Sequence, residues 1–195
     1  MDHGVPKLSP LQERLRDVSS RKDVSGALTL LADISALPSV KEQTTLRTDL
    51  LKNFGIFEKD NPDVFKLTCS FGYTLLYMKE HNSGSPLQSE KLEAMKLRLE
   101  TTLKSTEQIL ISDTDRANQV HAFGSSLKQS IDQAQAKNQP IPRVANKDLL
   151  KIPVLSQDAR GMLQSIADSS AQMLRSLENP RPLANPIIDT DIAEV

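Results

Sequence analysis

Helix-start signals recur along this chain, and they constrain its fold more than any other feature of its sequence. The tetrapeptide Ser-Pro-Leu-Gln occurs at residues 9–12 and again at residues 85–88. Its serine supplies an N-cap oxygen, its proline has the φ angle of a first helical position, and its glutamine can reach back to the cap. Ser39, with Glu42 three residues later, repeats this arrangement without the proline. The sequence therefore predicts a chain of well-delimited helices.

Apolar residues at helical spacing follow these signals and place the expected helices. We expect helices over 10–20, 23–37, 39–54 and 86–111, a break at Ser112–Asp115, a helix carrying Val120, Phe123, Leu127 and Ile131, and a last helix over 156–178. The predicted fold is all-α, a helical bundle of about six or seven helices with a flexible C-terminal tail. Its predicted parts are a disordered lead (1–8), the helical bundle (9–135), a proline-containing linker (136–155), a C-terminal helix (156–178) and a flexible acidic tail (179–195).

Residues 61–80 fit two patterns. From Phe65 to Leu75 apolar and polar residues alternate, which is typical of a half-buried strand. The segment also begins with Asn-Pro-Asp, which supplies a cap, a first-position proline and an acid at the helix dipole. A strand needs a partner, and the one other candidate, residues 151–155, contains a proline. A helix satisfies its own backbone, so the helix is favoured.

Composition and charge exclude several classes of protein. Only 4% of the residues are aromatic, so the core is expected to consist of Leu, Ile, Val, Met and Ala. The 24 basic and 25 acidic residues nearly balance, and we expect no bulk nucleic-acid binding. No apolar run can span a bilayer, and the N-terminus has no secretory signal. Cys69, the single cysteine, lies in an apolar run typical of a reduced thiol. We expect a cytoplasmic protein, with a nuclear location and leaderless export left open.

The residue types that carry chemistry do not gather at the spacing that a reaction needs. The three histidines lie in separate segments with no second ligand at zinc spacing. Asp113 and Asp115 resemble the start of a calcium loop, but its glycine and closing glutamate are absent, so the interpretation is helix capping. The sequence has no phosphate-binding loop and no nucleophile elbow. We expect no catalytic residue, no cofactor and no metal; an enzyme with a dispersed site is the third-ranked hypothesis.

The expected function is non-enzymatic binding of other proteins, as an adaptor, a regulator or a small structural subunit. Four leucines on one face of the helix over 86–111 form a predicted self-association seam, and packing inside the chain's own bundle is the alternative. Two isoleucines flanked by acids in the tail form a candidate docking strand. The predicted partner-binding residues are Leu92, Leu99, Leu103, Leu110, Ile187 and Ile188. The helix over 156–178 is a second candidate partner surface. The alternative function is that of a pathogen accessory protein, a secreted effector or viral regulatory protein that acts on host proteins.

One part of the chain is similar to a known family of docking domains. The similarity involves Asp23-Val24, Leu28, Leu31, Leu37, Leu51-Lys52 and Leu76-Tyr77-Met78-Lys79. On these residues, the stretch from 23 to 80 resembles the small helical bundle of the transcription-elongation-factor N-terminal class, in particular its integrase-binding relative. The resemblance implies a protein-docking module that gathers partners on chromatin. It covers less than a third of the chain, and the basic linkers usual in that family are absent here.

Overall fold

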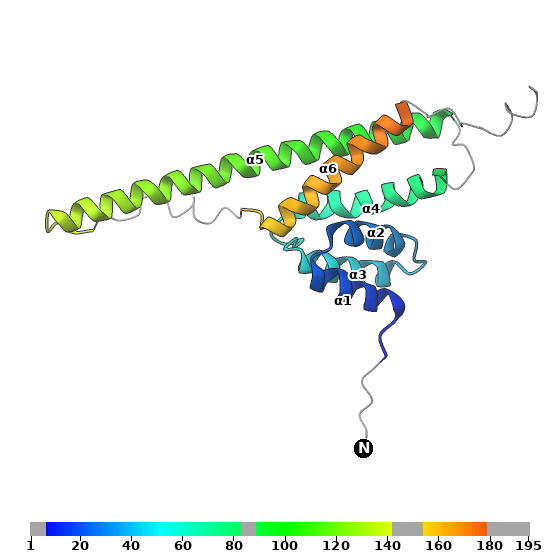
Figure 1. Ribbon diagram of the computed structural model, residues 1–195, viewed down its shortest axis with the longest axis horizontal. Helices are drawn as coiled ribbons and strands as arrows, with labels where there is room; N and C mark the ends of the chain where they lie inside the picture. The colour runs from blue at the N-terminus through cyan, green and yellow to red at the C-terminus, as the bar shows by residue number, and fades with distance from the viewer. Residues whose placement is uncertain (1–6, 83–88, 142–153, 179–195) are drawn as a thin grey trace, which may run out of the picture.

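The computed structural model describes residues 7–82, 89–141 and 154–178, and these residues form six α-helices and no strand (Figure 1). The helices are α1 (Pro10–Arg21), α2 (Val24–Ser35), α3 (Val40–Asn53), α4 (Pro62–Asn82), α5 (Ser89–Ala136) and α6 (Gln157–Glu178). The prediction of an all-α fold is therefore confirmed. None of the described helices is long and apolar enough to cross a membrane. The tail over 179–195, most of the predicted linker and most of the predicted lead lie outside the described residues.

The first three helices begin at the predicted caps. At the start of α1, Gln12 N–H donates to Ser9 Oγ over 3.3 Å, and Ser9 N–H donates to Gln12 Oε1 over 2.9 Å. This reciprocal pair is a complete capping box. Asp23 caps α2 and Ser39 caps α3, and each side chain accepts the backbone N–H three residues later, at 3.0 and 3.3 Å. The second Ser-Pro-Leu-Gln signal, at 85–88, lies outside the described residues.

Helix α4 confirms the helical interpretation of residues 61–80. The buried face of α4 includes polar side chains, and this explains why apolar and polar residues alternate in its sequence. Thr68 and Thr74 are both 0% exposed. Each hydroxyl donates to the carbonyl four residues earlier, at 2.7 and 3.2 Å. Because these hydroxyls find partners within their own helix, a threonine can occupy a buried position without an unsatisfied polar group.

Gly72 allows α4 to approach α2 closely. A Cβ atom at this position would lie 3.0 Å from Ser35 Oγ and 3.1 Å from the backbone oxygen of Leu31. We expect Gly72→Ala to lower the free energy of unfolding by about 1–3 kcal/mol, because the backbone of α2 cannot move aside freely. Gly161, inside α6, is the matched control, since a Cβ atom added there would have nothing within 4 Å.

We expect Gly161→Ala to raise the free energy of unfolding by up to about 1 kcal/mol, through helix propensity alone. Urea unfolding of both variants measures the two changes. Equal effects of the two substitutions would contradict the close approach of α2 and α4.

Helix α5 is a single element of 48 residues, so the predicted break at Ser112–Asp115 is wrong. The helix expected over 86–111 and the helix expected after it are continuous. Serine, threonine and aspartate favour a break in a helix when their side chains form hydrogen bonds with nearby backbone groups. Here Thr114 Oγ1 donates to the helix carbonyl four residues earlier, over 3.0 Å. The Asp113 carboxylate bonds to a distant part of the chain, so it does not cap a new helix.

Within the described part of the chain, two hydrophobic clusters hold the helices together. The larger contains residues from α1 to α4 and from the first part of α6, and its fully buried members include Leu30, Leu50, Phe71 and Leu163. The smaller joins the last part of α4, the first part of α5 and the end of α6. The helix expected over 156–178 is thus part of the main core. We call the packed region formed by α1–α4, α6 and the first part of α5 the body.

Helices α5 and α6 form the most extensive helix pair among the described residues. They run antiparallel: Arg160, near the start of α6, reaches Asp113 of α5, and Leu177, near its end, belongs to the cluster of Leu99. Figure 1 shows α6 lying along only one part of α5. The packing of α5 against the body therefore ends close to Asp113.

The rest of α5 projects beyond the other five helices (Figure 1). We call residues 117–136 the arm; at 1.5 Å per residue it is about 30 Å long. The arm ends in a turn in which Asn138 has a positive φ of 52° and Gln139 N–H donates to the Ala134 carbonyl over 2.8 Å. This bond pattern is that of a Schellman helix end. The arm is therefore a helix with a defined beginning at the body and a defined end.

Candidate functional site

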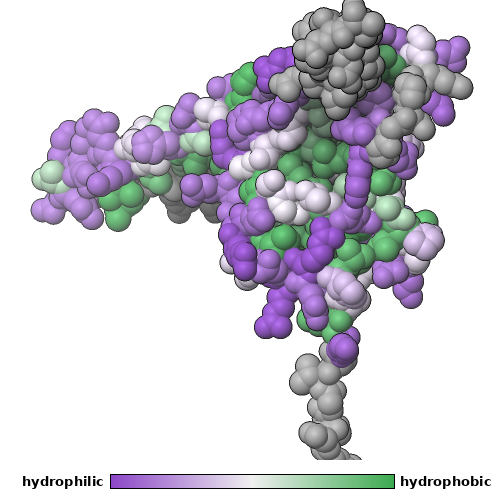
Figure 2. Space-filling view, turned by 45° about the vertical axis from the view of Figure 1, so that its right-hand side comes forward, coloured by the Kyte–Doolittle hydropathy of each residue, from purple (hydrophilic) through white to green (hydrophobic). Residues whose placement is uncertain are grey.

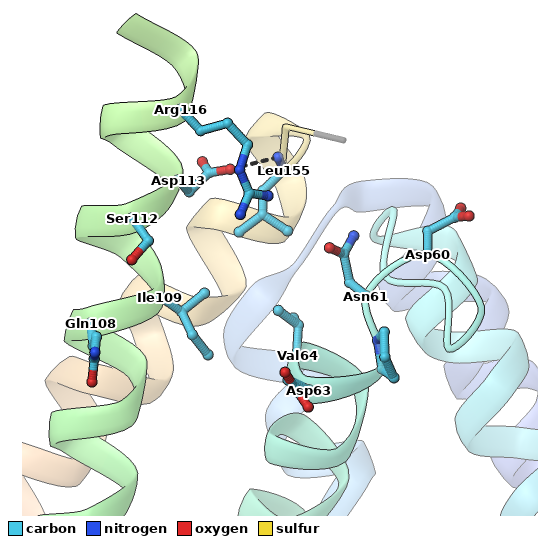
Figure 3. A pocket seen from close by; sticks show the side chains of 11 residues that line it. Asp60, Asn61, Asp63, Val64, Gln108, Ile109, Ser112, Asp113, Arg116 and Leu155 are labelled. Atoms are coloured by element: carbon cyan, nitrogen blue, oxygen red, sulfur yellow. Dashed lines mark hydrogen bonds between the residues drawn. The ribbon is translucent and has the colours of Figure 1, made fainter. Parts of the chain in front are cut away.

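A buried carboxylate fixes α6 on α5 at the point where the arm leaves the body. The side chain of Asp113 is only 3% exposed. The backbone N–H of Leu155, just before α6, donates to its Oδ1 over 2.8 Å (Figure 3). Arg160 donates to the other carboxylate oxygen and also, over 2.9 Å, to Thr114 Oγ1. Charge-assisted bonds of this kind are stronger than neutral ones, so this group of residues sets the position of α6 along α5. We call it the Asp113 node.

A pocket of about 640 Å³ opens beside the Asp113 node (Figure 3). One wall is the start of α4, with Asn61 and Asp63, and the facing wall is α5, with Ile109 and Arg116. Acidic, basic and apolar side chains all line it. Because both oxygens of Asp113 accept hydrogen bonds from the chain itself, this carboxylate is not a free general base. The arrangement is that of a structural joint between α4, α5 and α6.

The other side chains of the described residues that could bind a metal or act as nucleophiles are dispersed. Within residues 7–82, 89–141 and 154–178, no group of three or more His, Cys, Asp or Glu side chains is arranged to hold a metal ion. Burial raises the pKa of the Cys69 thiol to about 11, and this effect outweighs the nearby Arg47 guanidinium, which lowers the pKa. The thiol of Cys69 is therefore protonated at neutral pH and is a poor nucleophile.

Three of the four leucines of the predicted seam, Leu92, Leu99 and Leu110, pack against the body. Leu99 is 0% exposed, in the cluster with Met78, Met95 and Leu177. Leu92 packs against the same cluster, Leu110 packs against the main core, and Leu103 is half-buried. The structure thus places Leu92, Leu99 and Leu110 against other helices of the same chain, and the role of the seam in self-association stays a prediction. Ile187 and Ile188 lie outside the described residues.

The seven-residue spacing of the inward face of α5 continues along the arm. Leu99, Thr106 and Asp113, spaced seven residues apart, are buried against the body. The same spacing leads to Val120 and Leu127 on the arm, two helical turns per step. The arm's apolar face is therefore the continuation of the face that α5 uses inside the body.

On the arm this face carries a line of apolar side chains. Its members are Val120, Phe123, Leu127 and Ile131, and we call them the arm stripe. All four are half-buried, while most of the other arm residues are exposed. Neither hydrophobic cluster of the described residues includes them. Figure 2 shows the arm as a mostly hydrophilic projection with some hydrophobic residues among the hydrophilic ones.

Sequence reasoning identified the apolar residues of the arm but missed the Asp113 node. Asp113 was expected to cap a helix, and instead it is a buried acceptor in the middle of one. The signal that could have found it is its spacing, since Asp113 lies seven residues after Thr106 and fourteen after Leu99. A polar residue in phase with a buried face is expected to be buried and bonded.

Comparison with known proteins gives no identification. The resemblance of residues 23–80 to the transcription-elongation-factor N-terminal class stays a prediction. No family model, no curated protein and no solved structure matches the chain.

Proposed function

We propose that this chain is a non-enzymatic protein-interaction protein, an adaptor, regulator or small structural subunit of the cytoplasm. In this proposal the helices form a bundle whose task is to hold the arm, and the arm stripe binds partner proteins. The observation that carries the proposal is the arm itself, a helix of about 30 Å that projects from the body with an apolar line outside both hydrophobic clusters.

The energetics of helices support this proposal. A helix of this length that packs against no other described helix is marginal in water, because most helical stability in proteins comes from burial of an apolar face. Gly124 weakens the arm further by up to about 1 kcal/mol relative to alanine, and a Cβ atom added to it would have nothing within 4 Å. The arm is therefore expected to gain stability when a partner covers Phe123 and Leu127.

The distribution of polarity favours a one-sided contact. Apolar residues that recur at steps of three and four define one face of a helix, and a second helix or an apolar groove can cover such a face. Lys128 and Gln129, next to Leu127 in sequence but on other faces, are exposed. A partner is therefore expected to contact the arm stripe and to leave the polar side of the arm in water.

A site-specific photo-crosslinking experiment tests this proposal. A photoreactive amino acid is introduced at Leu127, on the stripe, or at the exposed Gln129, about 200° around the helix. The full-length chain is irradiated in cells that naturally produce it, and the adducts are identified by mass spectrometry. We expect protein adducts at residue 127 that are absent at residue 129.

Equal adducts at residues 127 and 129, or none at either, would overturn the proposed function. The mass of the adducts also shows the class of partner. Adducts of twice the chain mass contain a second copy, and adducts of any other mass contain a different protein. The two substituted positions lie in one helix two residues apart, so loss of folding affects both probes alike.

A further inference from the structure

The arm stripe, extended by the buried Ala134, is symmetric about Leu127. Phe123 and Ile131 lie four residues on either side of it, and Val120 and Ala134 lie seven residues on either side. Positions four and seven residues away share one helix face with the central residue. A two-fold symmetric interface requires this property, because each contact occurs twice with the two copies exchanged.

The small residues on the same face follow the same symmetry. Gly124 and Ser130 lie three residues before and after Leu127. The space beside Gly124 is open, since a Cβ atom added there would have nothing within 4 Å. In an antiparallel pair of arms centred on Leu127, the Gly124 of one copy lies at the same level as the Ser130 of the other, on the opposite edge of the contact. Small side chains at both edges of one level allow helix axes to approach closely.

From these observations we propose that the arm binds a second copy of this chain, antiparallel, with the two-fold axis at Leu127. This inference rests on the proposed function and names the partner. Phe123 of each copy then packs against Ile131 of the other, and the two Leu127 side chains meet at the axis. The charged residues Lys128 and Asp132 stay on the flanks and in water.

The length of the arm fits this arrangement. With the axis at Leu127, residue 136, the last of α5, lies opposite residue 118 of the other copy. Residue 118 is the second residue of the arm, directly after the Asp113 node and its pocket. With this axis the paired arms overlap from residue 118 to residue 136, which is nearly the whole length of each arm.

The expected interface is small. Two stripes of this length bury on the order of 1,000 Å² in total, which is the lower limit of specific interfaces. We therefore expect a dimer that dissociates on dilution. A monomer–dimer equilibrium of this kind is measurable by light scattering or by analytical ultracentrifugation over a wide range of concentration.

A charge placed at the axis is the first test. Leu127→Glu brings two carboxylates together in the dimer, and like charges in contact cost several kcal/mol. We expect the dissociation constant of the dimer to rise by more than about 100-fold. The control is Gln129→Glu, with the same new charge on the polar side of the same helix, and its dissociation constant is expected to remain within about threefold of the wild-type value. Circular dichroism of both variants checks that α5 is intact.

Cysteine cross-linking is the second test, and it reports the direction of the arms. A chain carrying Phe123→Cys is mixed with a chain carrying Ile131→Cys under mild oxidation, and the full-length proteins are separated without reductant. Disulfides need Cα atoms within about 7 Å of each other. We expect disulfides between the two variants to form faster than those between copies of either one. The wild-type chain, whose Cys69 thiol has its pKa raised to about 11, is the control for background oxidation.

The proposal is overturned if the wild-type chain is a monomer at every concentration. It is also overturned if Leu127→Glu and Gln129→Glu change the dissociation constant of the dimer equally. Preferred disulfides between copies of the Phe123→Cys variant would overturn the antiparallel direction. A monomer whose residue 127 photo-crosslinks to a different protein would reject the second copy and retain the proposed function. A monomer with no preferred adduct at residue 127 would reject both. The same monomeric result is expected if residues 142–153, which join Ile141 to Val154, cover the stripe.

Discussion

Replacing Asp113 with alanine is expected to lower the free energy of unfolding by about 3 kcal/mol. The carboxylate is 3% exposed and accepts hydrogen bonds from the Leu155 backbone and from Arg160. Without it, the Leu155 N–H is buried without an acceptor, and a buried unsatisfied donor costs about 1–3 kcal/mol. The Arg160 guanidinium also loses its charge partner at the start of α6. Urea unfolding of the full-length chain measures the change.

The control is Asp115→Ala, two residues along the same helix, where the side chain is exposed. Its effect is expected to stay within about 0.5 kcal/mol. A double-mutant cycle with Arg160→Ala then isolates the ion pair, and we expect the double variant to lose less stability than the two single variants together. Equal effects of Asp113→Ala and Asp115→Ala would show that the node does not hold α6 on α5.

Helix starts could be predicted because their chemistry is local. The caps at Ser9, Asp23 and Ser39 each need a side chain and a backbone N–H three residues away, and both are visible in sequence. The same holds for α4. A helix forms its backbone hydrogen bonds within itself, whereas a strand would have required a partner strand from a distant part of the chain. In these places the short-range pattern contains all the information that the fold uses.

The break at Ser112–Asp115 was predicted wrongly because its residues have two possible sets of partners. Taken locally, four short polar residues in a row favour a turn. In the structure, Asp113 bonds to Leu155, which lies 42 residues later in the chain. No local pattern can reveal that partner. Only the seven-residue spacing from Leu99 to Asp113, continued to Leu127, indicates that one face and one helix pass through the segment.

The same face of α5 therefore has two environments. Within the body it packs against α4 and α6, and on the arm it packs against none of the other described helices. From sequence alone, the leucines at 92–110 are the predicted self-association seam, and the residues of the stripe at 120–131 are expected only to lie in the next helix. The structure distinguishes these two sets of residues. Burial by other helices of the chain depends on the position of α6 along α5, and the Asp113 node fixes that position. A partner surface is thus better sought on the arm.

Leu99→Ala is expected to lower the free energy of unfolding by about 3 kcal/mol. The Leu99 side chain is 0% exposed and lies in the cluster that joins α4, α5 and α6. Removing it leaves a cavity between Met78, Met95 and Leu177, and buried Leu→Ala substitutions cost about 2–5 kcal/mol for this reason. Urea unfolding at a fixed protein concentration measures the loss, and light scattering of the folded variant measures its mass.

Leu97→Ala is the matched control, with the same chemical change two residues away at a side chain that is 64% exposed. We expect its effect on the free energy of unfolding to stay within about 0.5 kcal/mol. If Leu99→Ala weakens the fold and leaves the oligomeric mass unchanged, the leucine seam belongs to the interior of one chain. If it instead leaves unfolding unchanged and dissociates an oligomer, the seam is a contact between chains, and the place of α6 against α5 must be reassigned. Since Leu127→Glu is expected to do the opposite, changing mass more than stability, the two substitutions assign the two halves of α5 to separate roles.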